Sequence, residues 1–245
     1  MDWMTEKLER QLAIDYDCTL EQVHGAFHVL RPITMSENRR CNGWRGEGIS
    51  VAVYRGKLLV MAEDGLLDWC RAHWAGENAA WLSEPESLRA LDEELHRRGY
   101  KLLDAHHHYI PAMEWPRTPL RFPVRWIEGA ELEQFRGDAR FGQCLLWDAQ
   151  RPDLLAVCAM EGDEILGMAS ITRNCDQLWE IGVDVTAAGR SRGVGTYVTA
   201  LIKERVLAMG AVPTYATVES HIASQRVAFQ AGFIPAFYEL FAEKL

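Results

Sequence analysis

The stretch that decides the fold reads Ile181-Gly182-Val183-Asp184-Val185-Thr186-Ala187-Ala188-Gly189-Arg190-Ser191-Arg192-Gly193-Val194-Gly195-Thr196. A β-branched strand runs into a loop of glycines and arginines, and the loop opens into an amphipathic helix. The first N–H groups of a helix have no partner inside it, and the helix dipole adds positive potential there. Gly193 and Gly195 let the backbone approach an anion, and Arg190 and Arg192 add charge. The stretch therefore predicts a phosphate-binding loop.

The elements around this loop indicate a mixed sheet. We expect, in chain order, strands over 154–160, 164–172 and 178–185, a helix over 193–209, a strand over 212–218, a helix over 223–231 and a strand over 236–242. A Rossmann fingerprint would follow a parallel strand early in a βαβ unit, whereas here an antiparallel meander precedes the loop. A P-loop would need Gly-Lys followed by Ser or Thr, which is absent.

Two segments of this half resemble the motifs of one family. Arg190 to Gly195, preceded by Gly182 to Val185, resembles the acetyl-CoA-binding motif of the GNAT N-acetyltransferase superfamily. Glu219 to Phe233 resembles the second motif of that family, an Asn-x-x-Ser/Ala segment followed by a helix and Gly-Phe. The two motifs stand in the usual order and spacing, and the resemblance covers about residues 120–245. It implies a GNAT-like α/β (α+β) fold, with a mixed, mostly antiparallel sheet flanked by helices.

The resemblance also implies a site for acetyl-CoA. The strand over 178–185 would be the bulged strand of the family, whose backbone pairs with the pantetheine arm. The loop would hold the pyrophosphate, and His221 stands where the family usually has Asn. The cofactor-binding residues implied in this way are Val183, Val185, Arg190, Ser191, Arg192, Gly193, Val194, Gly195, Thr196, His221 and Ser224.

The reaction that the resemblance implies is direct attack of an amine on the acetyl thioester. It needs a deprotonated amine, an oxyanion donor, which the backbone N–H of Val183 would supply, and an acid for the thiolate. Glu180 is the candidate base, because several relatives carry a glutamate nearby and an ionised acid at a strand centre is costly. A solvent-facing or arginine-paired Glu180 is the alternative. The usual acid of the family, a tyrosine, is replaced here by Ala228, which leaves water or another group such as Tyr238.

The N-terminal half is expected to be a second α/β domain. Four prolines mark a connector between the halves, namely Pro111, Pro116, Pro119 and Pro123, and we place the domains at 1–118 and 119–245. The span 58–110 reads strand, helix, strand, helix, strand, and its last helix ends Arg-Arg-Gly-Tyr, much as the other half ends its last helix Gln-Ala-Gly-Phe. Two interpretations stay open: a degenerate copy of the GNAT-like fold, and an unrelated α/β piece.

Local signals in this half predict individual elements. We expect a helix over 2–14, a helix after a capping box at Thr19–Gln22, a strand over 26–33, a loop over 35–48, a hairpin of 49–54 with 57–61, a helix over 66–74, a strand fragment over 79–82, a helix capped by Ser83, and a strand over 101–110. Beyond the connector we expect a strand over 124–127 and helices over 131–135 and 141–147.

Two clusters of cationic or metal-ligating residues need an interpretation. In a strand, only His106 and His108 of the His106-His107-His108 run share a face, and no nearby carboxylate or cysteine completes a zinc set with the usual spacing. We therefore expect structural or domain-interface histidines and no metal site. Arg39-Arg40 lies in a polar segment and is expected to be a solvated pair.

Composition excludes some classes of function. The net charge of −9 argues against general binding to nucleic acid or anionic membranes, which needs a basic surface. The six cysteines are scattered without a C-x-x-C pair, which favours a reducing compartment over a disulfide framework. The N-terminus lacks an apolar signal core, and no apolar run approaches the roughly 20 residues of a membrane span. We expect a cytoplasmic protein without nucleic-acid or membrane partners.

Together these observations predict an acetyl-CoA-dependent N-acetyltransferase that acts on a primary amine of a small molecule or peptide. The first alternative is a CoA-binding regulatory or scaffold module without turnover, which the alanine at position 228 and the large N-terminal half favour. A second alternative is transfer to oxygen, or a longer acyl donor, on the same fold. A homodimer is counted among the expected partners.

Overall fold

The computed structural model describes residues 2–34, 36–40, 48–119 and 121–245, which form two compact units. Unit 1 comprises Met1–Lys7 and Tyr109–Pro235, and unit 2 comprises Leu8–His108 and Ala236–Leu245. The sequence placed a single boundary at residue 118 instead. The units divide elsewhere because strand β4 (Tyr100–Pro111) continues into the connector, and because most of the last strand, β10 (Phe233–Lys244), pairs within unit 2.

The strands of unit 1 lie in the order β9, β8, β7, β6, β5. Their bounds are β5 (Val124–Glu128), β6 (Asp153–Glu161), β7 (Glu164–Arg173), β8 (Leu178–Val185) and β9 (Val212–Val218). Neighbours from β5 to β8 are antiparallel, whereas β8 and β9 are parallel. The expected meander is confirmed, and with it the mixed, mostly antiparallel sheet.

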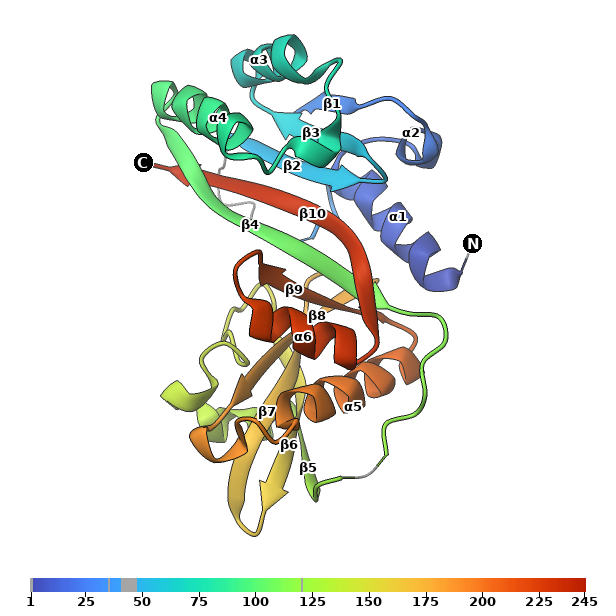
Figure 1. Cartoon of the computed structure of the whole chain (residues 1–245), viewed down its shortest axis with the longest axis vertical. Coiled ribbons are helices and arrows are strands. Elements are labelled where there is room, and N and C mark those ends of the chain that lie inside the picture. Colours follow the sequence, from blue (N-terminus) through green and yellow to red (C-terminus); the bar gives the residue numbers. More distant parts are fainter. Residues whose placement is uncertain (1, 35, 41–47, 120) are drawn as a thin grey trace. The chain divides into compact units, whose positions relative to one another are not determined.

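Helices cover both faces of this sheet. The long helix α5 (Val194–Ala208) and the shorter α6 (Ile222–Gln230) lie on one face (Figure 1). Val194, Val198, Ile202 and Val206 recur every four residues of α5 and are buried in one apolar cluster with the strands. On the other face, the short 3-10 helices η2 (Gly129–Phe135) and η3 (Ala139–Phe141) place their phenylalanines over β6 and β7.

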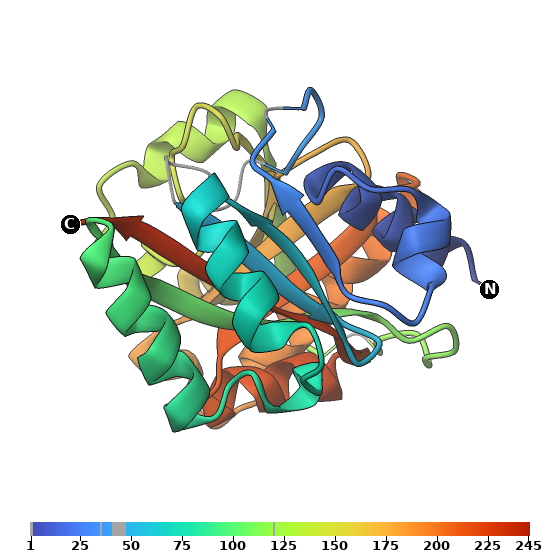
Figure 2. The same cartoon turned by 90° about the horizontal axis from the view of Figure 1, so that it is seen from above.

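Unit 2 has strands and helices of its own. Its elements are α1 (Trp3–Asp15, which begins in unit 1), α2 (Leu20–His24), β1 (Val29–Pro32), β2 (Ile49–Tyr54), β3 (Lys57–Ala62), α3 (Asp64–Trp74), η1 (Ala79–Trp81), α4 (Pro85–Arg97), and parts of β4 and β10. The strand order is β1, β3, β2, β10, β4. Figure 2 shows α3 and α4 side by side over one face, where their leucines pack on β2, β3 and β10.

A fully buried ionic cluster ties the last strand into unit 2. The guanidinium of Arg40 lies between Asp15 and Glu239 and donates to Glu239 Oε1 at 2.7 Å. Tyr16 Oη donates to the same oxygen at 2.8 Å, and His108 Nε2 lies 3.2 Å from Glu239 Oε2. The prediction of a solvated Arg39-Arg40 pair is therefore wrong for Arg40, because these carboxylates offset the cost of burying its charge.

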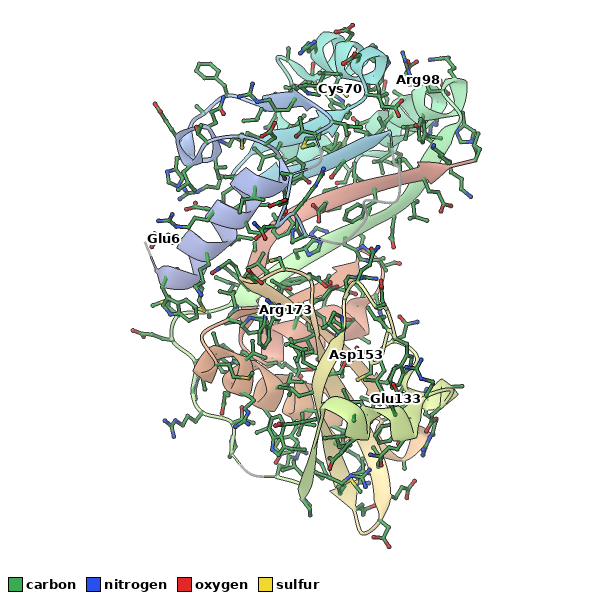
Figure 3. The ribbon with its side chains drawn as sticks, turned by 180° about the vertical axis from the view of Figure 1, so that it is seen from behind. Glu6, Cys70, Arg98, Glu133, Asp153 and Arg173 are labelled. Atoms are coloured by element: carbon green, nitrogen blue, oxygen red, sulfur yellow. The ribbon has the colours of Figure 1, made fainter. Side chains whose placement is uncertain are left out.

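Three local predictions in the chain are wrong for identifiable reasons. Residues 79–81 form the 3-10 turn η1 rather than a strand, because Asn78 Oδ1 accepts the Ala80 N–H. The N-cap of α4 is Glu84 rather than Ser83, with Pro85 at its first position. Residues 141–147 do not form a helix, because side chains elsewhere accept several of their N–H groups. Asp153, labelled in Figure 3, accepts the Trp147 N–H at 3.0 Å.

The other expected elements are confirmed within a few residues, including the Thr19 capping box and the hairpin of β2 with β3. The expected loop over 35–48 falls largely outside the described residues. None of the helices in the described part of the chain has the length and apolar character that a bilayer crossing requires.

Candidate active site

The centre of the site is the place where two parallel strands of unit 1 separate. The ladder between β8 and β9 covers Leu178–Ile181 and Val212–Tyr215. Both strands continue, over 182–185 and 216–218, but in the described residues they no longer pair with each other there. On its other side β8 stays paired with β7 up to Val185. The backbone edge of 182–185 that faces β9 is therefore open to another chain or ligand.

The open edge leads directly into the start of α5. Gly193 is the N-cap of the helix and has a left-handed φ of +77°, a conformation that suits glycine. The first intrahelical bond runs from the Tyr197 N–H to the Gly193 carbonyl, so the N–H groups of 194–196 precede it and have no partner inside the helix. These N–H groups are therefore available to an acceptor outside the helix.

The arginines of the loop differ in their surroundings. Arg190 is exposed, whereas Arg192 forms an ion pair with Glu161 at 2.5 Å. The hydroxyl of Thr196 donates to Gln230 Oε1 at 3.2 Å, which links the first turn of α5 to the end of α6. Arg192 therefore contributes less free positive charge to the loop than the sequence suggested.

A second source of positive charge comes from the proline-rich connector, and the sequence analysis missed it. A cavity of about 280 Å³ lies beside the first turns of α5 and is lined by Arg117, Arg121, Gly193, Tyr197 and Gln230 among others. The Arg121 guanidinium lies over the helix start, because a Cβ on Gly193 would be only 2.6 Å from Arg121 Nη1. No glutamate or aspartate is among the described residues that line this cavity. Its electrostatic character therefore suits an anion.

The loop after η3 packs against the face of β8 that carries Gly182 and Asp184. Asp184 Oδ2 accepts the N–H groups of Gln143 and Cys144 at 2.9 and 2.8 Å. A Cβ on Gly182 would lie 2.6 Å from the Cys144 carbonyl oxygen, so only glycine permits this close approach. The loop is thereby held against the strand at the point where the strands separate.

The candidate base Glu180 lies on the same face of β8, two residues before Gly182. Its carboxylate accepts a hydrogen bond from Asn174 Nδ2. Because an ionised carboxylate only accepts, this bond fixes the amide orientation and turns Asn174 Oδ1 away from Glu180. Asn174 is buried, and Oδ1 has no hydrogen-bond partner among the described residues. An unfilled acceptor thus lies beside the candidate base.

The residues of the second motif lie around the start of α6. His221 is exposed and is the N-cap of α6, and Ser224 is half-buried in its first turn. The Ser224 hydroxyl lies 2.8 Å from the hydroxyl of Tyr215, which sequence reasoning missed. Ala228, at the position of the usual acid, is fully buried in the apolar cluster under α5.

The other candidate acid, Tyr238, lies in unit 2. It faces the apolar cluster under α3 and α4, and its ring centroid is 5.2 Å from that of His107. It is therefore not part of the compact unit that carries the separated strands. His108 stacks on Phe237 with 4.3 Å between the ring centroids and has a structural role in the ionic cluster.

The comparison with known families decides the identity of this unit. The model described as acetyltransferase (GNAT) family matches residues 113–233. Residues 113–233 form a GNAT acetyltransferase domain. The separated strands, the helix start at Gly193 and the hydroxyl pair of Tyr215 and Ser224 all lie within the GNAT domain.

Solved structures are similar to larger or smaller parts of the chain. A GCN5-related N-acetyltransferase-like protein from Streptococcus suis is 16% identical with a TM-score of 0.51, over 99% of this chain and 98% of its own. The protein yncA from Salmonella typhimurium, solved with its cofactor acetyl-CoA, is 14% identical with a TM-score of 0.36, over 50% of this chain and 94% of its own.

A third structure, the aminoglycoside N-acetyltransferase AAC(6')-Iy in complex with CoA, is 22% identical with a TM-score of 0.34, over 46% of this chain and 91% of its own. The sequence matches none of the curated proteins with which it was compared. The Streptococcus suis likeness shows that the GNAT-like fold class expected from the sequence is correct.

Proposed function

We propose that the chain is an acetyl-CoA-dependent N-acetyltransferase that transfers an acetyl group to a primary amine of a small molecule or peptide. One observation carries the proposal: in the GNAT domain, β8 and β9 separate after Ile181 and Tyr215, and the open edge of β8 leads into a helix start with unpaired N–H groups. An extended ligand that ends in a pyrophosphate would lie along the open strand edge and place the pyrophosphate at the helix start.

Each part of acetyl-CoA has a counterpart along this path. The pantetheine arm would pair with the backbone of 182–185, and the pyrophosphate would accept from the N–H groups of 194–196. Arg117 and Arg121 of the connector border the same helix start and would hold the remaining phosphate charge. His221 and Ser224 lie at the start of α6, the helix that follows β9.

The chemistry is a direct transfer. The amine nitrogen would attack the acetyl carbon, the C–S bond would break, and a backbone N–H near Val183 would stabilise the oxyanion. Glu180 would remove a proton from the substrate ammonium before the amine attacks, with Asn174 fixing the direction of the Glu180 carboxylate. Glu180→Gln should flatten the acid limb of the pH–rate profile, and an unaltered profile would exclude Glu180 as the base.

One observation favours a second candidate function. Ala228 is fully buried at the position where the family usually has its acid, so the domain lacks that hydroxyl. A CoA-binding module without turnover would tolerate this loss. The leaving thiolate of CoA is itself stable enough to depart without a strong acid, which is why transfer stays the first proposal.

The test has two stages. Acetyl-CoA should raise the melting temperature of the protein, and a panel of small-molecule and peptide amines should then include members that release free CoA thiol. Stabilisation by acetyl-CoA with no thiol release over the whole panel would favour the module without turnover. No stabilisation at all would contradict both candidate functions.

A further inference from the structure

A pair of hydroxyl groups, one on a buried tyrosine and one on a half-buried serine, lies where the two strands of the GNAT domain separate. Tyr215 is opposite Ile181 in the last paired position of β8 and β9, and it is 2% exposed. Its hydroxyl lies 2.8 Å from the hydroxyl of Ser224, and either oxygen can be the donor. The two hydroxyls carry two protons and the bond between them uses one, so one O–H is left to donate elsewhere.

The pair lies against the face of α6 from which the usual acid of the family would project. Ser224 and Ala228 are four residues apart and therefore lie on the same face of α6. Ala228 and Tyr215 belong to one apolar cluster and are both buried. The side chain at 228 carries no hydroxyl, and the ring of Tyr215 packs in the same cluster from β9.

The surroundings keep the Tyr215 hydroxyl protonated at neutral pH. Burial raises the pKa of Tyr215, the hydrogen bond with Ser224 lowers it, and the nearby Tyr109 raises it, with a net increase above 10.0. A neutral O–H is what a proton donor needs, and Ser224 can donate to Tyr215 Oη while the Tyr215 proton points elsewhere.

We propose that Tyr215 is the catalytic acid of the transfer and that Ser224 is its positioning residue. This inference rests on the proposed function. As the amine nitrogen bonds to the acetyl carbon and the C–S bond breaks, the sulfur takes the proton of Tyr215 Oη. The nitrogen of the substrate ammonium loses two protons in all: Glu180 removes one before the attack, and the second leaves the tetrahedral intermediate. Both pass to solvent and solvent returns one to the tyrosinate, so the cycle ends with the amide, the CoA thiol and one released proton.

The test is Tyr215→Phe with acetyl-CoA and the most active amine of the panel. We expect kcat to fall about a hundredfold, with the KM for acetyl-CoA within about twofold of the wild type. Ser224→Ala should lower kcat less, because Tyr215 keeps its proton. An unchanged kcat in Tyr215→Phe would overturn the proposal.

Tyr54→Phe is the matched control. Tyr54 is also a buried tyrosine, and its hydroxyl donates to Glu9 Oε1 at 2.7 Å within unit 2, so its loss removes one hydrogen bond without touching the pair. Its kcat should stay within about threefold of the wild type. An equal fall in both variants would show a structural effect and overturn the proposal.

A second measurement is independent of turnover and separates this inference from the proposed function. In the CoA complex, a donor beside the sulfur stabilises the thiolate, so Tyr215→Phe should lower the acid dissociation constant of the bound CoA thiol about tenfold. Thiolate absorbance followed against pH measures it. An unchanged constant overturns the inference even if transfer is observed, and a failure of CoA to bind the wild type overturns both.

Discussion

Each unit runs a strand directly into a helix, and the two junctions differ in charge. In unit 1, β8 passes through Arg190 and Arg192 to a left-handed glycine before α5. In unit 2, β3 passes through Glu63, the N-cap, to Asp64 at the first position of α3. Those carboxylates already complement the helix dipole, so this helix start disfavours another anion.

The open strand edge is the second difference. In unit 2, β3 is paired over its whole length with β2 and from Leu59 to Ala62 with β1, which leaves its described backbone without an edge like that of β8. A helix start is therefore an anion site only when no carboxylate already lies at it and the strand before it has an open backbone edge. We propose on this basis that unit 2, whether or not it is a degenerate copy of the GNAT fold, does not bind CoA.

The largest expected effect comes from making the junction of unit 1 acidic. Gly193→Glu should abolish the thermal stabilisation by acetyl-CoA, because it places a carboxylate at the helix start and forces a side chain into a left-handed position. Gly162→Glu is the control, since Gly162 also has a positive φ but nothing within 4 Å of its Cβ position. An unchanged melting shift in Gly193→Glu would remove the phosphate-binding role of this loop.

The second prediction concerns how unit 2 holds the last strand. Glu239→Gln should destabilise the protein by about 3 kcal/mol, because it leaves the buried Arg40 with less compensating charge. Glu243→Gln, on the same strand, breaks an exposed pair with Lys101 and should cost less than about 1 kcal/mol. Urea unfolding measures both. Equal changes would contradict the role assigned to the buried cluster.

The carboxyl of Glu239 also makes the stability of the fold depend on pH. Burial alone would raise the pKa of Glu239, but Arg40 and His108 outweigh it and hold the pKa well below its usual value. A carboxyl with a lowered folded pKa stabilises the fold above its unfolded pKa, here about 4.5, and loses this contribution as the pH falls. Stability should therefore decline below pH 4.5 more steeply in the wild type than in Glu239→Gln.

The smallest expected effect concerns the connector. Arg117→Gln and Arg121→Gln should each weaken acetyl-CoA binding about tenfold, and the loss should shrink at high salt. Arg205→Gln on α5 is the control, because Arg205 is an exposed arginine paired with Glu128. Titration calorimetry at two salt concentrations measures all three variants. An equal loss in Arg205→Gln would reduce the connector effect to net charge alone.

Sequence patterns predicted the structural features that depend on residues close together in the chain. The hydrophobic periodicity of α5, the Thr19 capping box and the glycine loop are local features, and all three have the expected structure. Residues 141–147 lacked such a signal, because their fold depends on Asp153 at the start of β6 and on Asp184, 40 residues beyond Cys144 in β8.

The buried ionic cluster and the rest of the site could not be predicted, because both are built by long-range pairing. Arg40 looked solvated until Glu239, 199 residues away, supplied its partner. Nothing in the sequence placed Tyr215 opposite Ile181 or brought its hydroxyl to Ser224. The connector arginines carried a weak signal, as two cations within a proline-rich segment that precedes the first strand of the GNAT domain.

Hydrogen–deuterium exchange with and without acetyl-CoA tests the central claim most directly. The account predicts slower exchange of the amides of 182–185, 190–196 and 216–218, where the separated strands and the helix start would contact the ligand. It predicts no change over 59–67, at the acidic junction of unit 2. Unchanged exchange over 190–196, or protection over 59–67, would contradict it.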